Sequence, residues 1–448
     1  MKKFTGRNAE LNYLKQYYDK EDSRLLVVYG SKGVGKTRLL QEFCRGKKWS
    51  YYLARACADR EQRWQWAGEL REANRELGKY PEYEELFEAA LLPRETEKQI
   101  LVIDEFHHMI KADSDFFEKL VRFLENRLLS RPVMVVLCTS ASGWVENSLI
   151  GKIGSLAASI DGFLKLRELS FEEISRLFPE YSLEDSICTY AVLGGVPGYW
   201  MNFSPAAGIR ENLIQNILTK ESRLYEEMAL FMEQELREPA VYNTILTALA
   251  RDCSKLNDIY RHTGFSRAKI SVYLKNLMEL DLVEKVYSFE TAGWENAQKG
   301  IYRISSPYVK FYYRYLFTNQ SLLQLISPEE FYDRKIADSF ELFVDEAYRK
   351  ICREKLGQEY KTVGEWLGKT GNLDIVAMDA EGKVCVAMCS YAAKMKLEDY
   401  EWLLFSMKKA KLSDADIRLY CEKGFADELV EKAGKENVPL LRLTETMK

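Results

Sequence analysis

Short apolar runs alternate with longer amphipathic segments in the first third of the chain. Five runs rich in β-branched or aromatic residues have the length of strands: residues 25–29, 51–54, 100–104, 133–137 and 163–166. Between them lie segments of helical period, the longest at residues 62–77 and 114–129. Continuous apolar strands separated by helices are typical of a parallel sheet covered on both faces. The pattern therefore predicts an α/β domain over residues 1–166.

After Glu168 the strand pattern stops and helical patterns follow. Ser170 and Glu173 form a capping-box pattern that begins a helix, which ends at Pro179. Helical segments continue to residue 236, interrupted by a turn rich in glycine at residues 194–198. We therefore predict a helical domain over residues 167–236.

The next segment, residues 237–306, combines three short helices with two strands. The helical patterns cover residues 240–250, 255–263 and 266–279, and the strands cover residues 283–287 and 301–304. This order is typical of a winged helix-turn-helix.

In the third of these helices, apolar residues recur at helical spacing. Ile270, Leu274 and Leu277 are predicted to face the core. The stripe on the opposite side carries Arg267, Ser271 and Lys275. A recognition helix would place its contacts to double-stranded DNA on this stripe. Two cations are few for a tight DNA binder, so packing or protein contact is an equally good interpretation.

The last segment, residues 307–448, predicts a smaller α/β domain. A helix begins near residue 340, and strands follow at residues 373–378, 384–389 and 417–421, with helices between them.

Composition narrows the classes of function. The net charge is −4, from 64 Lys and Arg and 68 Asp and Glu, so nucleic acid can be attracted only by a local patch. Nine cysteines without a CxxC pair favour reduced thiols and argue against a disulfide framework or a zinc site, and three histidines argue against a histidine-rich metal centre. The start of the chain is polar and no apolar run reaches membrane-spanning length. We expect a cytoplasmic protein without membrane contact.

The turn after the first strand carries the strongest chemical signal. Residues 30–37 read GSKGVGKT and match GxxxxGK[ST] in full, between a predicted strand and a predicted helix. The glycines let backbone N–H groups turn inward around a polyphosphate, and the helix N-terminus adds its dipole. ATP is therefore the predicted ligand. Its binding residues are predicted to be Gly30, Ser31, Lys32, Gly33, Val34, Gly35, Lys36, Thr37 and Arg38.

Three further positions complete the predicted chemistry. Lys36 is expected to reach the β- and γ-phosphates, while Thr37 and Asp104 are expected to hold Mg²⁺. Glu105 is expected to polarise the attacking water. Residues 138–140 (Cys-Thr-Ser), after the strand at residues 133–137, offer a hydroxyl to the γ-phosphate or the water, with Ser140 as the predicted residue, although serine and threonine also favour strand ends as ordinary turn chemistry. The predicted catalytic residues are thus Lys36, Glu105 and Ser140.

These motifs resemble the prokaryotic P-loop ATPases of the archaeal type, within the AAA/STAND-like division. Residues 4–11 (FTGRNAEL) are similar to that family's opening F-x-G-R-x-x-E-L, and residues 194–197 (GGVP) to its lid motif G-G-x-P. The pair Asp104 and Glu105 looks like its acidic strand end, and Ser140 lies where its sensor residue lies. The resemblance continues through the winged helix to the C-terminal domain.

The resemblance implies further roles. Gly6 and Arg7 would lie beside the adenine, and residues 167–236 would form a lid over the nucleotide. A basic residue from the lid or from a neighbouring subunit often completes the site in this division, and Arg167 is one candidate.

The C-terminal domain resembles the restriction-endonuclease-like fold that is often attached to these ATPases. Active members carry an Asp on one strand and Glu-x-Lys on the next, which together hold Mg²⁺ and the attacking hydroxide. Asp374 matches the first element, but Met388 and Ser390 stand where the Glu and Lys belong. A thioether is a poor ligand for a hard cation, and the substitutes elsewhere are Lys394 or Glu365. We expect a nuclease-inactive domain.

The leading hypothesis is an Mg-dependent ATPase that acts as a nucleotide-driven switch of the winged helix and the C-terminal domain. A second hypothesis is a DNA-binding regulatory module gated by ATP. A third is a scaffold of a defence-type system that binds a protein partner or a second copy of the chain.

Overall fold

The chain folds into two compact units, which we describe from a computed structural model. The first comprises Met1–Glu168 with Glu279–Asp281, and the second comprises Leu169–Met278 with Leu282–Lys448. The structure describes residues 6–73, 76–91, 97–126, 132–235, 238–289, 300–368 and 371–446.

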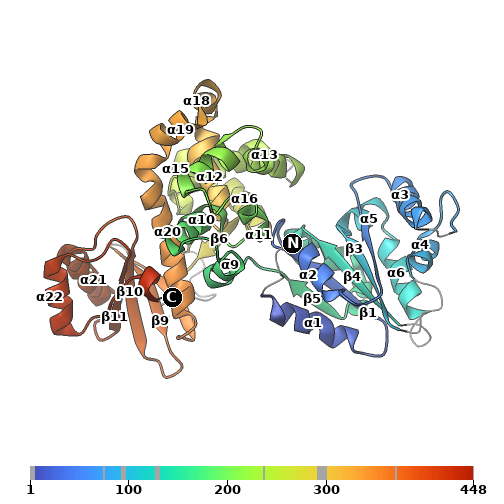
Figure 1. Ribbon diagram of the computed structural model, residues 1–448, viewed down its shortest axis with the longest axis horizontal. Coiled ribbons are helices and arrows are strands. Elements are labelled where there is room, and N and C mark those ends of the chain that lie inside the picture. The colour runs from blue at the N-terminus through green and yellow to red at the C-terminus, as the bar shows by residue number, and fades with distance from the viewer. Residues whose placement is uncertain are drawn as a thin grey trace. The chain divides into compact units, whose positions relative to one another are not determined.

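The first unit is a parallel sheet between helices (Figure 1). Its strands are β1 (Arg24–Tyr29), β2 (Trp49–Leu53), β3 (Gln99–Asp104), β4 (Val133–Thr139) and β5 (Gly162–Lys165). The main helices are α1 (Asn8–Tyr18), α2 (Lys36–Phe43), α3 (Asp59–Glu72), α4 (Tyr83–Ala90), α5 (His107–Ala112) and α6 (Phe116–Glu125). Shorter helical turns, among them α7 (Ser142–Trp144) and α8 (Ile150–Ile153), precede β5.

The strand order is β2-β3-β4-β1-β5, with every pairing parallel. Successive residues of β1 enter different cores: Leu25 and Val27 pack with α3 to α6, whereas Leu26 and Val28 pack with α1 and α2. Both faces of the sheet are therefore buried, which explains the unbroken apolar runs and confirms the predicted α/β core.

The second unit begins with helices. They are α9 (Phe171–Leu177), α10 (Leu183–Leu193), α11 (Pro197–Trp200), α12 (Ile209–Leu213) and α13 (Arg223–Glu235). The predicted capping box is present at α9, where the backbone N–H of Glu173 donates to Ser170 and that of Ser170 donates to Glu173. At the turn before α11, a Cβ on Gly195 would lie 1.8 Å from the carbonyl oxygen of Leu169, so only glycine fits there.

The winged helix follows closely on the predicted pattern. It consists of α14 (Pro239–Ala250), α15 (Leu256–Thr263), α16 (Arg267–Glu279) and the antiparallel strands β6 (Val283–Val286) and β7 (Ile301–Ile304). Ile270, Leu274 and Leu277 of α16 are fully buried, which confirms the predicted core face.

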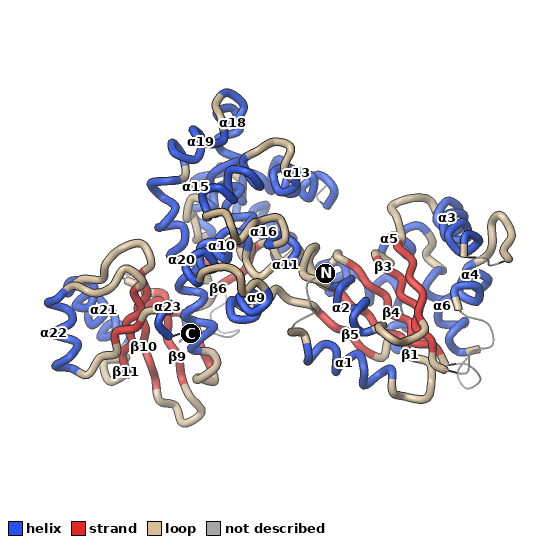
Figure 2. The backbone as a smooth tube through the Cα atoms, in the orientation of Figure 1, coloured by secondary structure: helices blue, strands red, loops and turns tan. Residues whose placement is uncertain are grey.

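The second unit ends in a mixed sheet, whose strands lie beside α21 in Figure 2. Helices α17 (Pro307–Phe311), α18 (Gln320–Leu325), α19 (Pro328–Lys335) and α20 (Ala337–Leu356) lead into it. Its strands are β8 (Thr362–Leu367), β9 (Asn372–Met378), β10 (Val384–Ser390), β11 (Asp416–Cys421) and β12 (Leu440–Leu441), with helices α21 (Leu397–Ala410), α22 (Asp427–Glu436) and α23 (Leu443–Thr446). The order is β12-β11-β10-β9-β8, antiparallel from β8 to β10 and parallel beyond.

A buried ion pair joins the wing to this sheet. The guanidinium of Arg303 on β7 donates to both carboxylate oxygens of Glu365 on β8, each at 2.6 Å. Glu365 is only 5% exposed, and Arg353 of α20 lies 3.6 Å from the same carboxylate. The backbone N–H of Leu367 donates to Ser288, just after β6. The wing and the sheet are therefore parts of one packed structure.

Among the described residues, no helix combines the length and the apolar character that a membrane crossing requires.

We expect Glu365→Ala to lower the free energy of unfolding by about 3–5 kcal/mol, because it leaves two guanidinium groups without their buried partner. Urea unfolding followed by circular dichroism measures the change. Asp416→Ala, on β11 of the same sheet, is the control: it removes an exposed ion pair with Lys383 and should change the stability far less. Equal effects of the two substitutions would contradict the prediction.

Candidate nucleotide-binding site

The predicted site residues meet at one edge of the first sheet, because parallel strands end on the same side. β1 leads into the loop at residues 30–35, β3 ends at Asp104 and β4 ends at Thr139. Since β4 lies between β1 and β3, its end comes between the loop and the acidic pair.

The loop is shaped by its glycines. Gly33 and Gly35 have φ of 84° and 102°, a left-handed conformation that other residues rarely adopt, and Gly35 precedes the first turn of α2. A Cβ on Gly30 would lie 2.3 Å from the carbonyl oxygen of Leu166. The loop therefore needs glycine for both conformation and space.

The side chain of Lys36 lies across this loop. Its ammonium donates to the carbonyl oxygens of Gly30, at 2.7 Å, and Ser31, at 3.2 Å, and the residue is only 7% exposed. Thr37 and Arg38 follow it and are exposed, as is Lys32 within the loop. The cation is thus held in the concave part of the loop.

Two hard oxygen donors face each other beside the loop. The hydroxyl of Thr37 donates to Oδ2 of Asp104 at 3.5 Å, and Asp104 is 5% exposed. Tyr51 on β2 donates to the same oxygen at 2.8 Å. A hydroxyl and a carboxylate are ligands that suit Mg²⁺, so this donor set fits the predicted metal.

The carboxylate of Glu105 is held by the end of β4. Its Oε2 accepts hydrogen bonds from the backbone N–H of Ser140, at 3.0 Å, and from the hydroxyl of Thr139, at 3.1 Å. Nδ1 of His107 lies 3.3 Å from this oxygen and 2.8 Å from the Thr139 hydroxyl. Burial by itself raises the pKa of Glu105, but the hydrogen bonds from His107 and Ser140 outweigh it and lower the pKa to about 2.

Arg7 connects the loop to the end of β5. Its guanidinium donates to the carbonyl oxygens of Val34, at 3.3 Å, and Arg167, at 2.6 Å, and pairs with Glu10 at 2.8 Å. Arg167 therefore takes part through its backbone, and its side chain is exposed. Phe4 and Thr5 of the predicted opening motif lie outside the described residues.

The sequence does not predict two members of this site, Tyr51 and His107. His107 lies two residues after Glu105, and Thr139 belongs to the segment at the end of the strand at residues 133–137 where a hydroxyl is predicted. Tyr51 carries no local signal, because it lies in a strand whose other tyrosine, Tyr52, is an ordinary core residue.

On the winged helix, the outward stripe is exposed as the spacing indicates. Arg267, Ser271 and Lys275 all reach the surface. The guanidinium of Arg267 lies over the ring of Tyr260, 4.4 Å from its centre, and donates to Asn257 at 2.9 Å. These two contacts fix the position of the Arg267 guanidinium.

In the C-terminal sheet, the positions matching a nuclease site have other partners. Asp374 accepts from Arg349, at 3.4 Å, and from the backbone N–H of Cys389, at 3.0 Å. Met388 packs on an apolar cluster and Ser390 donates to the carbonyl of Ala393. Glu365 is held by Arg303, and Lys394 is exposed. Within the described ranges, no cluster of three or more His, Cys, Asp or Glu side chains is arranged to hold a metal.

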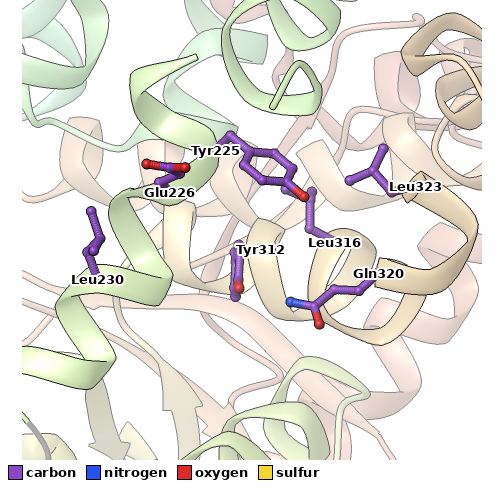
Figure 3. A pocket seen from close by; sticks show the side chains of 7 residues that line it. All are labelled: Tyr225, Glu226, Leu230, Tyr312, Leu316, Gln320 and Leu323. Carbon is purple, nitrogen blue, oxygen red and sulfur yellow. The ribbon is translucent and has the colours of Figure 1, made fainter. Parts of the chain in front are cut away.

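A separate cavity of about 310 Å³ lies in the second unit, between α13 and the segment from Tyr312 to Leu323 (Figure 3). Its lining residues are Tyr225, Glu226, Leu230, Tyr312, Leu316, Gln320 and Leu323. It contains none of the predicted site residues.

Comparison with protein families agrees with this arrangement. Residues 4–203 match the family described as an ATPase domain predominantly from Archaea. Residues 4–203 are therefore a P-loop ATPase domain of the archaeal type. Residues 243–285 match the bacterial regulatory proteins of the arsR family, whose module is a helix-turn-helix, and residues 312–401 match archaeal and bacterial proteins of unknown function.

Individual relatives are distant. An uncharacterised protein of Methanocaldococcus jannaschii is 24% identical over 390 residues, 85% of each chain. An uncharacterised ATP-binding protein of the same organism is 36% identical over 45 residues, which are 10% of this chain and 76% of that protein. Among solved structures, the Walker-type ATPase of Pyrococcus abyssi is 15% identical, with a TM-score of 0.49 over 69% of this ATPase and 96% of that chain. The ORC2 protein of Aeropyrum pernix, in complexes with ADPNP and ADP, is 14% identical, with a TM-score of 0.43 over 72% and 95%.

The low pKa of Glu105 makes part of the stability acid-sensitive. Because the folded-state pKa lies near 2 and the ordinary value is 4.5, this stabilisation is complete above pH 4.5 and is lost as the pH falls toward 2. In Glu105→Gln, the free energy of unfolding should therefore fall less steeply over this range, by on the order of 2 kcal/mol. Urea unfolding between pH 3 and pH 7 measures it, and identical acid slopes would contradict the prediction.

Proposed function

We propose that this ATPase binds and hydrolyses MgATP at the edge of the first sheet, and that the nucleotide state controls its second unit. The observation that carries the proposal is the convergence of the glycine loop, the Lys36 ammonium and the two carboxylates of Asp104 and Glu105 on one edge. The ATPase family match over residues 4–203 supports it.

In this proposal each group of residues has a separate role. Residues 30–38 supply the phosphate cradle, and the Lys36 ammonium exchanges its loop carbonyls for phosphate oxygens. Thr37 and Asp104 hold Mg²⁺, which when bound neutralises charge that develops on the phosphates. Glu105 accepts the proton of the attacking water, with Ser140 beside it.

A carboxylate with several donors is a weak base. Glu105 must therefore exchange some of its contacts with the end of β4 for the attacking water before it accepts a proton. This requirement would make hydrolysis slow.

The link to the second unit runs through Arg7. It bonds the loop at Val34 and the backbone at Arg167, and the second unit begins at Leu169. A change in the loop on binding phosphate therefore acts on the connecting segment. In this proposal residues 1–166 are the catalytic core, 167–236 the lid, 237–306 the winged helix, and 307–448 a nuclease-like domain without cleavage activity.

A second candidate function, ATP-gated binding of double-stranded DNA, is favoured by the exposed stripe on α16. Arg267 is held by Asn257 and Tyr260 at the start of the helix, so little side-chain entropy is lost on contact with phosphate or a base edge. The arsR-type match covers this helix.

Lys36→Ala should abolish nucleotide binding, because the loop loses its only buried cation among the described residues. Glu105→Gln should retain binding and slow turnover by about 100-fold, since an amide cannot take the proton. Binding of a fluorescent ATP analogue and release of phosphate measure the two effects. Glu118→Gln, on the exposed side of α6, is the matched control and should leave both unchanged. Wild-type turnover in Glu105→Gln would reject the assigned base.

If α16 binds DNA, the double substitution Arg267→Glu and Lys275→Glu should abolish binding to a duplex. Replacing either residue alone should lower the slope of log K against log salt by about 1. Fluorescence anisotropy at several salt concentrations, with and without ATP, measures both. The charge-matched control is Lys408→Glu with Lys409→Glu on the exposed side of α21. Equal loss in the control, or no binding by any form, would reject the DNA interface.

A further inference from the structure

Tyr51 has an unusual placement for a residue on an edge strand. Its side chain is 38% exposed, like its neighbours on the same face of β2, Trp49 and Leu53. Yet its hydroxyl donates to Oδ2 of Asp104 at 2.8 Å. The register pairs Tyr51 with Val102 and Leu53 with Asp104, so the ring reaches diagonally across to the last residue of β3. The polar end of an exposed side chain is thus directed into the site.

The two oxygens of Asp104 have different partners. Oδ1 accepts from the backbone N–H of Glu105 at 2.9 Å. Oδ2 lies between two hydroxyls, that of Tyr51 at 2.8 Å and that of Thr37 at 3.5 Å. The backbone bond and the Tyr51 bond together fix the plane of the carboxylate, and the face of Oδ2 toward Thr37 is the side where the proposed metal would bind.

The Tyr51 hydroxyl is the donor in this bond, because a carboxylate oxygen only accepts.

The neighbouring residue shows what a purely structural tyrosine does in this strand. Tyr52 is fully buried, its hydroxyl donates to the carbonyl of Gln62 at 3.1 Å, and its ring stacks on Trp66 with centres 4.4 Å apart. None of these contacts involves the site, so Tyr52 provides a matched control in the next position of the chain.

We infer that Tyr51 is a positioning residue, which holds the carboxylate of Asp104 in the orientation that lets Asp104 and Thr37 bind Mg²⁺. The inference rests on the proposed MgATP site. Outer donors of this kind fix the rotation of a ligating carboxylate, and their removal typically weakens metal affinity by about 10- to 100-fold.

Tyr51→Phe removes one oxygen and keeps the ring. At a fixed concentration of a fluorescent ATP analogue, the Mg²⁺ concentration needed for half of the metal-dependent binding signal should rise about tenfold. Affinity for the analogue in EDTA should equal that of the wild type. Tyr52→Phe should keep the wild-type Mg²⁺ requirement.

A double-mutant cycle tests whether Tyr51 acts through Asp104. If it does, Tyr51→Phe should add little to the effect of Asp104→Asn on the Mg²⁺ requirement. An unchanged Mg²⁺ requirement in Tyr51→Phe, or an equal loss of binding in EDTA, would overturn the inference while leaving the nucleotide site intact. A wild-type protein that binds the analogue without any response to Mg²⁺ would overturn the proposed metal site as well.

Discussion

Burial of charge at the end of an apolar sheet is the constraint on which the nucleotide site depends. A carboxylate or an ammonium removed from water is costly unless hydrogen bonds replace its hydration. The structure meets this need with fixed donors and acceptors: Tyr51 and the N–H of Glu105 for Asp104, the end of β4 for Glu105, and loop carbonyls for Lys36. The same partners orient the groups, so the contacts that stabilise the site also fix the side chains that the proposed MgATP would meet.

In the second unit, arginines pair with the buried carboxylates. Glu365 is neutralised by Arg303 and Arg353, and Asp374 by Arg349. One of these pairs, Arg303 with Glu365, also joins the wing to the sheet.

Short connections link the glycine loop to the segment that leads into the second unit. Arg7 contacts the loop and the residue two positions before the second unit. Within that unit the wing is bonded to β8, so the winged helix and the C-terminal sheet have few ways to move independently.

The sequence by itself determined the features that depend on neighbouring residues. Apolar runs marked β1, β3 and β4, helical spacing placed Ile270 and Leu274 in the core, and the glycine pattern located the phosphate loop, because burial and turn geometry leave a local record. The sequence pattern does not predict β8, because this strand includes Gly364, is mostly half-buried and contains no apolar run. Only the tertiary structure brought Tyr51 to Asp104 and Thr139 to Glu105, since strand order and register are fixed by long-range packing that no local pattern encodes.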